Sequence, residues 1–182
     1  MTAPERRPLL LLSGFMGTGK STLGRALADQ TGATFEDLDA ALEVEAGCTI
    51  AELFAEHGEA AFRDLERARL VELLASECDG ARIVALGGGT LVDPESRRRA
   101  LEGAFVVTLV AEVDTIVARC AGSARPLLAS MSSPEEAAQR VRALMQARAE
   151  AYEAGHLHVT TDGQPPEALA RALAARWVAV DR

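Results

Sequence analysis

The chain has 182 residues, of which 48% are hydrophobic, with 19 Lys and Arg against 27 Asp and Glu. This length suits one domain, expected over residues 1–182, and the hydrophobic fraction excludes overall disorder. The formal net charge of −8 argues against nucleic acid or an anionic membrane as the main partner. It does not exclude an anionic small molecule, because a local cluster of arginines can override the global field.

The three cysteines are far apart and form no CxxC pair: Cys48, Cys78 and Cys120. An odd, scattered count indicates reduced thiols in a cytosolic protein rather than a disulfide framework or a zinc site. Basic residues before the apolar run 9–12 faintly resemble an export signal, but the run is too short and is better explained as a buried strand. No other stretch approaches the length of a membrane span, so we expect a cytoplasmic protein without a membrane partner.

Short apolar runs predict strands, and longer segments with helical spacing predict helices. The predicted strands are 9–12, 33–36, 83–86, 105–110 and 156–160. The predicted helices are about 20–30, 39–46, 49–56, 59–76, 94–101, 113–120, 134–154 and 167–178. Residues 121–133 are rich in small residues and lack periodicity, so they are predicted as a loop. The alternation of strands with helices predicts an α/β fold with a mostly parallel sheet.

A glycine-rich motif follows the first predicted strand. Residues 14–21, GFMGTGKS, fit the pattern GxxxxGK(S/T) between a strand and a helix. The glycines let backbone N–H groups point at phosphates, and the positive end of the following helix adds to the attraction. Lys20 can reach the β- and γ-phosphates, and the Ser21 hydroxyl can ligate Mg²⁺. The loop predicts nucleotide binding, but it does not separate a kinase from a GTPase, an ATPase or a regulatory module.

An acidic pair follows the second predicted strand. Many P-loop proteins place a magnesium-organising aspartate after a later strand, but here the strand 83–86 is followed by glycines. Asp37 and Asp39 are the natural alternative. One could meet Mg²⁺ through water, and the other could accept a hydrogen bond from a substrate hydroxyl and help to remove its proton. Asp39 could instead cap a helix, and spacing alone leaves both interpretations open.

Five motifs, in order and spacing, resemble those of the shikimate kinases over nearly the whole chain. They are the phosphate loop 14–22, FEDLD at 35–39, GEAAFRDLE at 58–66, LGGG at 86–89 and RPLL at 125–128. The resemblance implies a three-layer αβα P-loop kinase fold with a central five-stranded parallel sheet, a substrate-binding helical segment and a flexible lid at about 121–133. It implies a monomer that phosphorylates shikimate to shikimate 3-phosphate with ATP, in the pathway to chorismate and the aromatic amino acids.

The resemblance also implies roles for individual residues. The implied catalytic residues are Lys20, Asp39 and Arg125. The implied ATP-binding residues are Gly17, Thr18, Gly19, Lys20, Ser21, Thr22, Arg125 and Gln164. The implied shikimate-binding residues are Asp39, Arg63, Gly87, Gly88, Gly89 and Arg148. Mg²⁺ would be held by Ser21 and, through water, by Asp37.

Chemistry supports the two arginines, because a guanidinium fork binds a carboxylate through two parallel hydrogen bonds. Arg63 and Arg148 nevertheless lie in charge-rich segments, where a solvated helix face is the alternative. Arg119 could contact nucleotide or act only as a cation at a helix end. Leu38 departs from the family pattern, in which a small polar residue is commoner, and its side chain is expected to point away from the cleft.

Two rival functions share parts of this pattern. The nearest is a P-loop kinase for another small hydroxy acid such as gluconate, or for a nucleoside monophosphate. These kinases share the loop and the lid but not the combination of Asp39, Arg63 and three glycines. The other is a non-catalytic nucleotide-binding module, which would usually have lost part of the phosphate and magnesium set.

Overall fold

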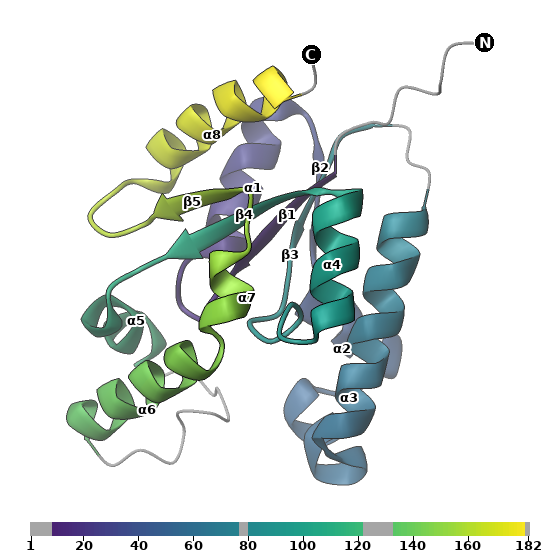
Figure 1. Ribbon diagram of the computed structural model, residues 1–182, viewed down its shortest axis with the longest axis vertical. Coiled ribbons are helices and arrows are strands. Elements are labelled where there is room, and N and C mark those ends of the chain that lie inside the picture. The colour runs from purple at the N-terminus through teal and green to yellow at the C-terminus, as the bar shows by residue number, and fades with distance from the viewer. Residues whose placement is uncertain (1–8, 77–79, 122–132, 181–182) are drawn as a thin grey trace.

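The computed structural model describes residues 9–76, 80–121 and 133–180 of the chain. Its central sheet contains the strands β1 (Leu9–Gly14), β2 (Thr34–Asp37), β3 (Arg82–Ala85), β4 (Phe105–Val110) and β5 (Leu157–Thr160). Their order is β2-β3-β1-β4-β5, and every neighbouring pair is parallel (Figure 1). The predicted α/β class and the five-stranded parallel sheet are confirmed.

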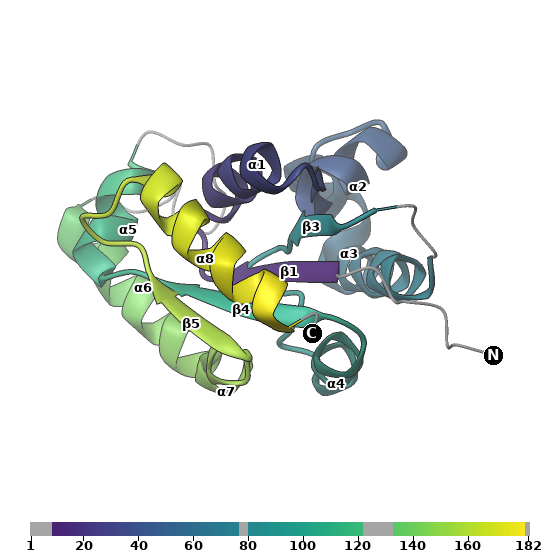
Figure 2. The same cartoon turned by 90° about the horizontal axis from the view of Figure 1, so that it is seen from above.

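Helices cover both faces of this sheet. They are α1 (Lys20–Thr31), α2 (Leu38–Ala46), α3 (Ile50–Ala75), α4 (Pro94–Gly103), α5 (Val113–Cys120), α6 (Pro134–Ala147), α7 (Ala149–Glu153) and α8 (Pro166–Val180). Figure 2 shows α1 on one side of the sheet and α4 and α7 on the other, which is the expected three-layer arrangement. Among the helices that the structure describes, none combines the length and apolar character needed to cross a membrane.

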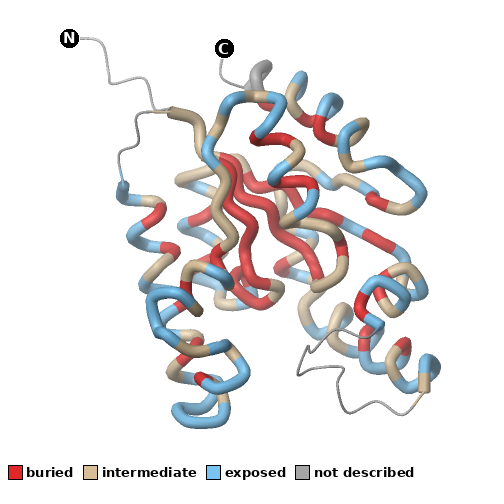
Figure 3. Tube along the Cα trace, turned by 180° about the vertical axis from the view of Figure 1, so that it is seen from behind, coloured by how far each residue is buried: buried red, intermediate tan, exposed pale blue. Residues whose placement is uncertain are grey.

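The core has one layer on each side of the sheet, because successive strand residues point to opposite faces. Leu10 and Leu12 of β1 pack with residues of α1 and α8, including Leu27 and Trp177. Leu11, between them, packs with residues of α2, α3 and α4. Figure 3 shows β1 and its neighbours buried within helices whose outer turns are exposed. A strand buried on both faces explains why this segment reads as an uninterrupted apolar run.

The long helix α3 bends at Gly58, where φ is 79° and ψ is 167°. The sequence predicted two helices with their boundary at this place, and the structure has two helical segments that meet at this kink. A positive φ is readily adopted only by glycine, so the bend is encoded by a single residue. The helix begins with a capping box in which the side chains of Thr49 and Glu52 each bind the other's backbone N–H.

The single helix predicted at 134–154 is wrong, because the structure divides it into α6 and α7 at Arg148. Arg148 has φ −113° and ψ 11°, and its N–H donates to the carbonyls of Leu144 and Met145 at 3.1 and 3.2 Å. Neither glycine nor proline lies at the break, so the helical spacing of apolar residues in this segment gave no sign of it. At this break, the Arg148 side chain donates to the carbonyl of Gly88 in the loop after β3.

Candidate active site

The phosphate loop connects β1 to α1 at the carboxyl edge of the sheet, where ligands bind in folds of this kind. Gly17 and Gly19 have φ values of 77° and 94°, which side chains disfavour. Space is also short, since a methyl group at Gly17 would lie 2.8 Å from the sulfur of Cys120. Thr18 closes the turn by donating from Oγ1 to the carbonyl of Phe15 at 2.7 Å. The loop therefore has the curled form that its sequence predicts.

Lys20 begins α1 and folds back over the loop. Its Nζ donates to the carbonyl oxygens of Gly14 at 2.9 Å and Phe15 at 3.0 Å. These bonds keep the ammonium group beside the position where nucleotide phosphates meet a P-loop. Thr22, also in the first turn of α1, is exposed.

Ser21 and Asp37 converge beside the loop, because the Ser21 hydroxyl donates to Asp37 Oδ2 at 2.5 Å. The other Asp37 oxygen accepts from the N–H of Ala40 at 3.4 Å, so Asp37, rather than Asp39, caps α2. A hydroxyl and a carboxylate are donors that Mg²⁺ accepts, so the pair fits the expected metal site. No group of three or more His, Cys, Asp or Glu among the described residues could hold a metal, so these two would need phosphate oxygens and water to complete the shell.

Asp39 lies in the first turn of α2 and faces Gly87. A methyl group at Gly87 would lie 2.7 Å from Asp39 Oδ1 and 2.6 Å from Glu66 Oε1, so two carboxylates meet over a bare Cα. Burial raises the pKa of Asp39 from 3.8 to about 6. The charge of Glu66 acts in the same direction on this pKa, whereas Lys20 and Arg63 oppose it. A carboxyl group with this pKa can accept a proton near neutral pH.

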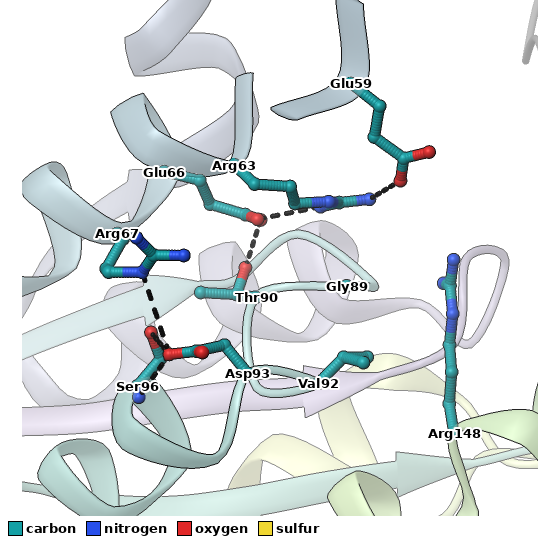
Figure 4. A pocket seen from close by; sticks show the side chains of 10 residues that line it. All are labelled: Glu59, Arg63, Glu66, Arg67, Gly89, Thr90, Val92, Asp93, Ser96 and Arg148. Carbon is teal, nitrogen blue, oxygen red and sulfur yellow. Dashed lines mark hydrogen bonds and ion pairs between the residues drawn. The ribbon is translucent and has the colours of Figure 1, made fainter. Parts of the chain in front are cut away.

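Glu66 is 2% exposed and has a partner on each carboxylate oxygen. Oε1 accepts from the Thr90 hydroxyl at 2.5 Å, and Oε2 accepts from Arg63 Nη1 at 2.7 Å (Figure 4). A buried carboxylate is tolerated when it is paired in this way. The sequence placed Glu66 in a motif without giving it or Thr90 a role. The spacing of three residues between Arg63 and Glu66 on one helix was the available signal.

The Arg63 guanidinium is held between two acids over the glycine loop. Its Nη2 donates to Glu59 Oε1 at 3.1 Å, in addition to the bond with Glu66. A methyl group at Gly89 would lie 2.6 Å from Arg63 Nη1. The glycines were expected to admit a ligand to the backbone. In the structure, the side chains of Asp39, Glu66 and Arg63 occupy the space above Gly87 and Gly89.

A pocket of about 230 Å³ opens beside this cluster. Arg63 borders it from α3, and Arg148 extends toward it from the opposite side (Figure 4). The guanidinium fork of an arginine suits a small carboxylate, which is the ligand expected for Arg63 and Arg148. The charged side chains that line the pocket beside these two are Arg67, Glu59, Glu66 and Asp93. The structure thus brings together the two arginines that the sequence singled out.

Gly88 connects this pocket to the phosphate loop. A methyl group on Gly88 would lie 3.4 Å from the backbone nitrogen of Met16, which belongs to the loop. The carbonyl oxygen of Gly88 accepts from Arg148 Nη1 at 3.2 Å. Gly89, the next residue, lines the pocket, so the glycine triplet lies between the phosphate loop and the pocket.

Arg119 ties the phosphate loop to the segment after β5. Its Nη1 donates to the carbonyl of Gly17 at 3.3 Å and to the Thr161 hydroxyl at 3.0 Å, and Nη2 donates to the Thr161 carbonyl at 3.0 Å. Gln164 lies in the exposed turn that follows Thr161. Arg125 and most of the lid expected at 121–133 lie outside the described residues.

This fold and site define a class: a P-loop kinase with a phosphate loop and a neighbouring pocket lined by arginines. The model of the shikimate kinase family matches residues 16–177. The shikimate kinase of Geobacter sulfurreducens is 40% identical over 168 residues, with 92% of this chain and 89% of the relative covered. That of Streptomyces coelicolor is 41% identical over 167 residues, with 91% and 92% covered.

The solved structures give the same result. Shikimate kinase from Acinetobacter baumannii, in complex with shikimate, superposes with a TM-score of 0.86 at 31% identity. The match covers 97% of this chain and 96% of that one. The chain belongs to the shikimate kinase family.

Proposed function

We propose that the protein catalyses the ATP-dependent phosphorylation of shikimate to shikimate 3-phosphate, a step toward chorismate and the aromatic amino acids. The observation that carries this proposal is the pocket that Arg63, Arg148 and Gly89 line, next to Gly88, which lies against the phosphate loop. Membership in the family, and the relative in complex with shikimate, support the choice of acid.

The nucleotide half of the site would bind ATP along the start of α1. The backbone N–H groups of Gly17 to Thr22 would hold the phosphates, with Lys20 reaching the β- and γ-phosphates. Ser21 and, through water, Asp37 would hold Mg²⁺, which when bound neutralises charge on the phosphates. Gln164 would contact the adenine end. Arg125 would close over the transferring phosphate and exclude water, which otherwise competes as acceptor.

The acceptor half would hold shikimate against the glycine loop. Arg63 and Arg148 would clamp its carboxylate, and the backbone of 87–89 would line the same surface. Asp39 would accept the proton of the attacking hydroxyl as that oxygen bonds to the γ-phosphorus. The bond from phosphorus to the bridging oxygen of ADP breaks in the same transfer, so ADP leaves and the proton remains on Asp39 until solvent removes it. We also propose that the protein acts as a monomer in the cytoplasm.

The test is a coupled assay of ADP release by the purified protein with Mg·ATP and, in parallel, shikimate, gluconate and nucleoside monophosphates. Shikimate should support turnover, and the other acceptors should not. Turnover with another acceptor and none with shikimate would refute the proposal. ATP binding without ADP release for any acceptor would instead indicate a non-catalytic module.

A further inference from the structure

The carbonyl oxygen of Gly88 accepts two hydrogen bonds from the α6–α7 region. The Tyr152 hydroxyl donates at 2.6 Å and Arg148 Nη1 donates at 3.2 Å. A donor–acceptor distance of 2.6 Å is short for an O–H···O bond, whereas 3.2 Å is at the long limit for N–H···O. The two donors lie one helical turn apart, with Arg148 at the break between the helices. Tyr152 is therefore the stronger partner of this carbonyl.

The phenol of Tyr152 is fixed by its surroundings. Its ring meets Phe15 of the phosphate loop edge-on, with the centroids 6.4 Å apart and the planes at 84°. Nε2 of His158 lies 2.9 Å from the Tyr152 carbonyl oxygen, which fixes the backbone at the same residue. Burial raises the pKa of Tyr152, although a hydrogen bond with the Arg148 side chain acts in the opposite direction, so the hydroxyl stays protonated and able to donate at neutral pH.

In the proposed function, Arg148 binds the carboxylate of the acceptor in addition to its hydrogen bond with the Gly88 carbonyl. A guanidinium that turns toward the acid weakens or breaks its long bond to Gly88. A carbonyl that loses its donor in a partly buried site is costly, but this one would keep the shorter bond from Tyr152. Without the phenol hydroxyl, Arg148 would have to abandon the carbonyl in order to bind the acid.

We propose that Tyr152 is a positioning residue for the acceptor: by holding the Gly88 carbonyl and contacting Arg148, it leaves the Arg148 guanidinium placed to bind the acceptor's carboxylate. This inference rests on the proposed function, since it requires an acid in the pocket. It concerns the acceptor half alone, because the packing of the Tyr152 ring on Phe15 does not depend on the hydroxyl.

The test is Tyr152→Phe, which removes the hydroxyl and keeps the ring. KM and Kd for shikimate should rise about tenfold, while kcat and the KM for ATP change by less than about twofold. Thr108→Val is the matched control, since it removes a buried hydroxyl on β4 for which the structure shows no hydrogen-bond partner. An unchanged shikimate KM in Tyr152→Phe, or equal losses for ATP and shikimate, would overturn the proposal.

A double-mutant cycle with Arg148→Ala separates positioning from general loosening of the pocket. If Tyr152 acts through Arg148, removing its hydroxyl has no further effect on shikimate Kd once Arg148 is gone. Kd is measured by NMR titration, because the Arg148 variant needs no turnover for this readout. Additive losses would overturn the proposal. Absence of shikimate binding by the wild-type protein would overturn the proposed function together with it, whereas normal wild-type binding and an unaffected Tyr152→Phe would overturn this inference alone.

Discussion

Replacing Glu66 by glutamine should extend the activity toward acid pH. Asp39 must be ionised to accept a proton, and burial together with the charge of Glu66 raises its pKa to about 6. In the wild-type protein, kcat/KM for shikimate should therefore fall about tenfold per pH unit below that value. Removal of the Glu66 charge favours the ionised form of Asp39, so the pKa falls and activity persists at lower pH.

The size of the effect follows from the geometry above Gly87. Asp39 Oδ1 and Glu66 Oε1 lie 2.7 and 2.6 Å from one point, so they are within about 5 Å of each other. Two unit charges at this separation repel by about 0.8 kcal/mol in water and about 3 kcal/mol at an effective dielectric constant of 20. Because one pKa unit is about 1.4 kcal/mol, the midpoint should fall by between about half a unit and two units.

Glu59→Gln is the matched control. Glu59 also pairs with Arg63, but it is exposed and is not among the charges that act on the pKa of Asp39. Both variants loosen Arg63 and should raise KM, but only Glu66→Gln should move the midpoint. The measurement is ADP release at limiting shikimate between about pH 5 and pH 9 at constant ionic strength. If Glu66→Gln did not shift the midpoint of the pH profile, the loss of activity at acid pH would come from a group other than Asp39.

Three further substitutions test the site. Asp39→Asn should lower kcat by about 10²–10⁴-fold. The pKa of Asp39 is about 6 in the folded protein and ordinarily 3.8, so the ionised carboxylate lowers the stability of the folded protein at pH 8. Asp39→Asn should therefore raise the free energy of unfolding by up to about 3 kcal/mol at pH 8 and leave it unchanged at pH 3. Equal thermal stability of the two proteins at pH 8 would contradict the raised pKa. Arg63→Lys should raise the shikimate KM while ATP binding survives, and equal loss of both would indicate misfolding. Gly87→Ala should lower kcat/KM about tenfold or more by displacing two carboxylates, whereas Gly80→Ala, in open space, should have no effect.

The sequence predicted the sheet and the phosphate loop because each depends on local composition. The run Leu9–Leu12 is apolar on both faces, and the structure extends it to the strand Leu9–Gly14. Gly17 and Gly19 carry the positive φ values that the motif needs. The kink at Gly58 lies where two helices were expected to meet, because this glycine also adopts a positive φ. Features of this kind can be predicted from the local sequence, because they do not depend on which distant residues pack against them.

The features that the sequence did not predict depend on contacts between distant segments. Arg148 interrupts a periodic helix without glycine or proline, and its side chain bonds to a loop sixty residues away. The pairing of Glu66 with Thr90 joins α3 to the loop after β3. Asp37, not Asp39, caps α2, because β2 ends with Asp37 at the helix N-terminus. Spacing along the chain carries no information about such pairings.

Glu66 shows why dividing the site into binding and catalytic residues is incomplete. One of its oxygens holds Arg63, which would bind the acceptor, and the other lies over Gly87 with Asp39, which would take the proton. A single buried carboxylate therefore holds Arg63 in place and adds to the effect of burial in raising the pKa of Asp39. A substitution at Glu66 must change both KM and the pH profile. Arg63→Ala, unlike Arg63→Lys, removes a charge that lowers the pKa of Asp39 and should move the acid limb toward neutral pH.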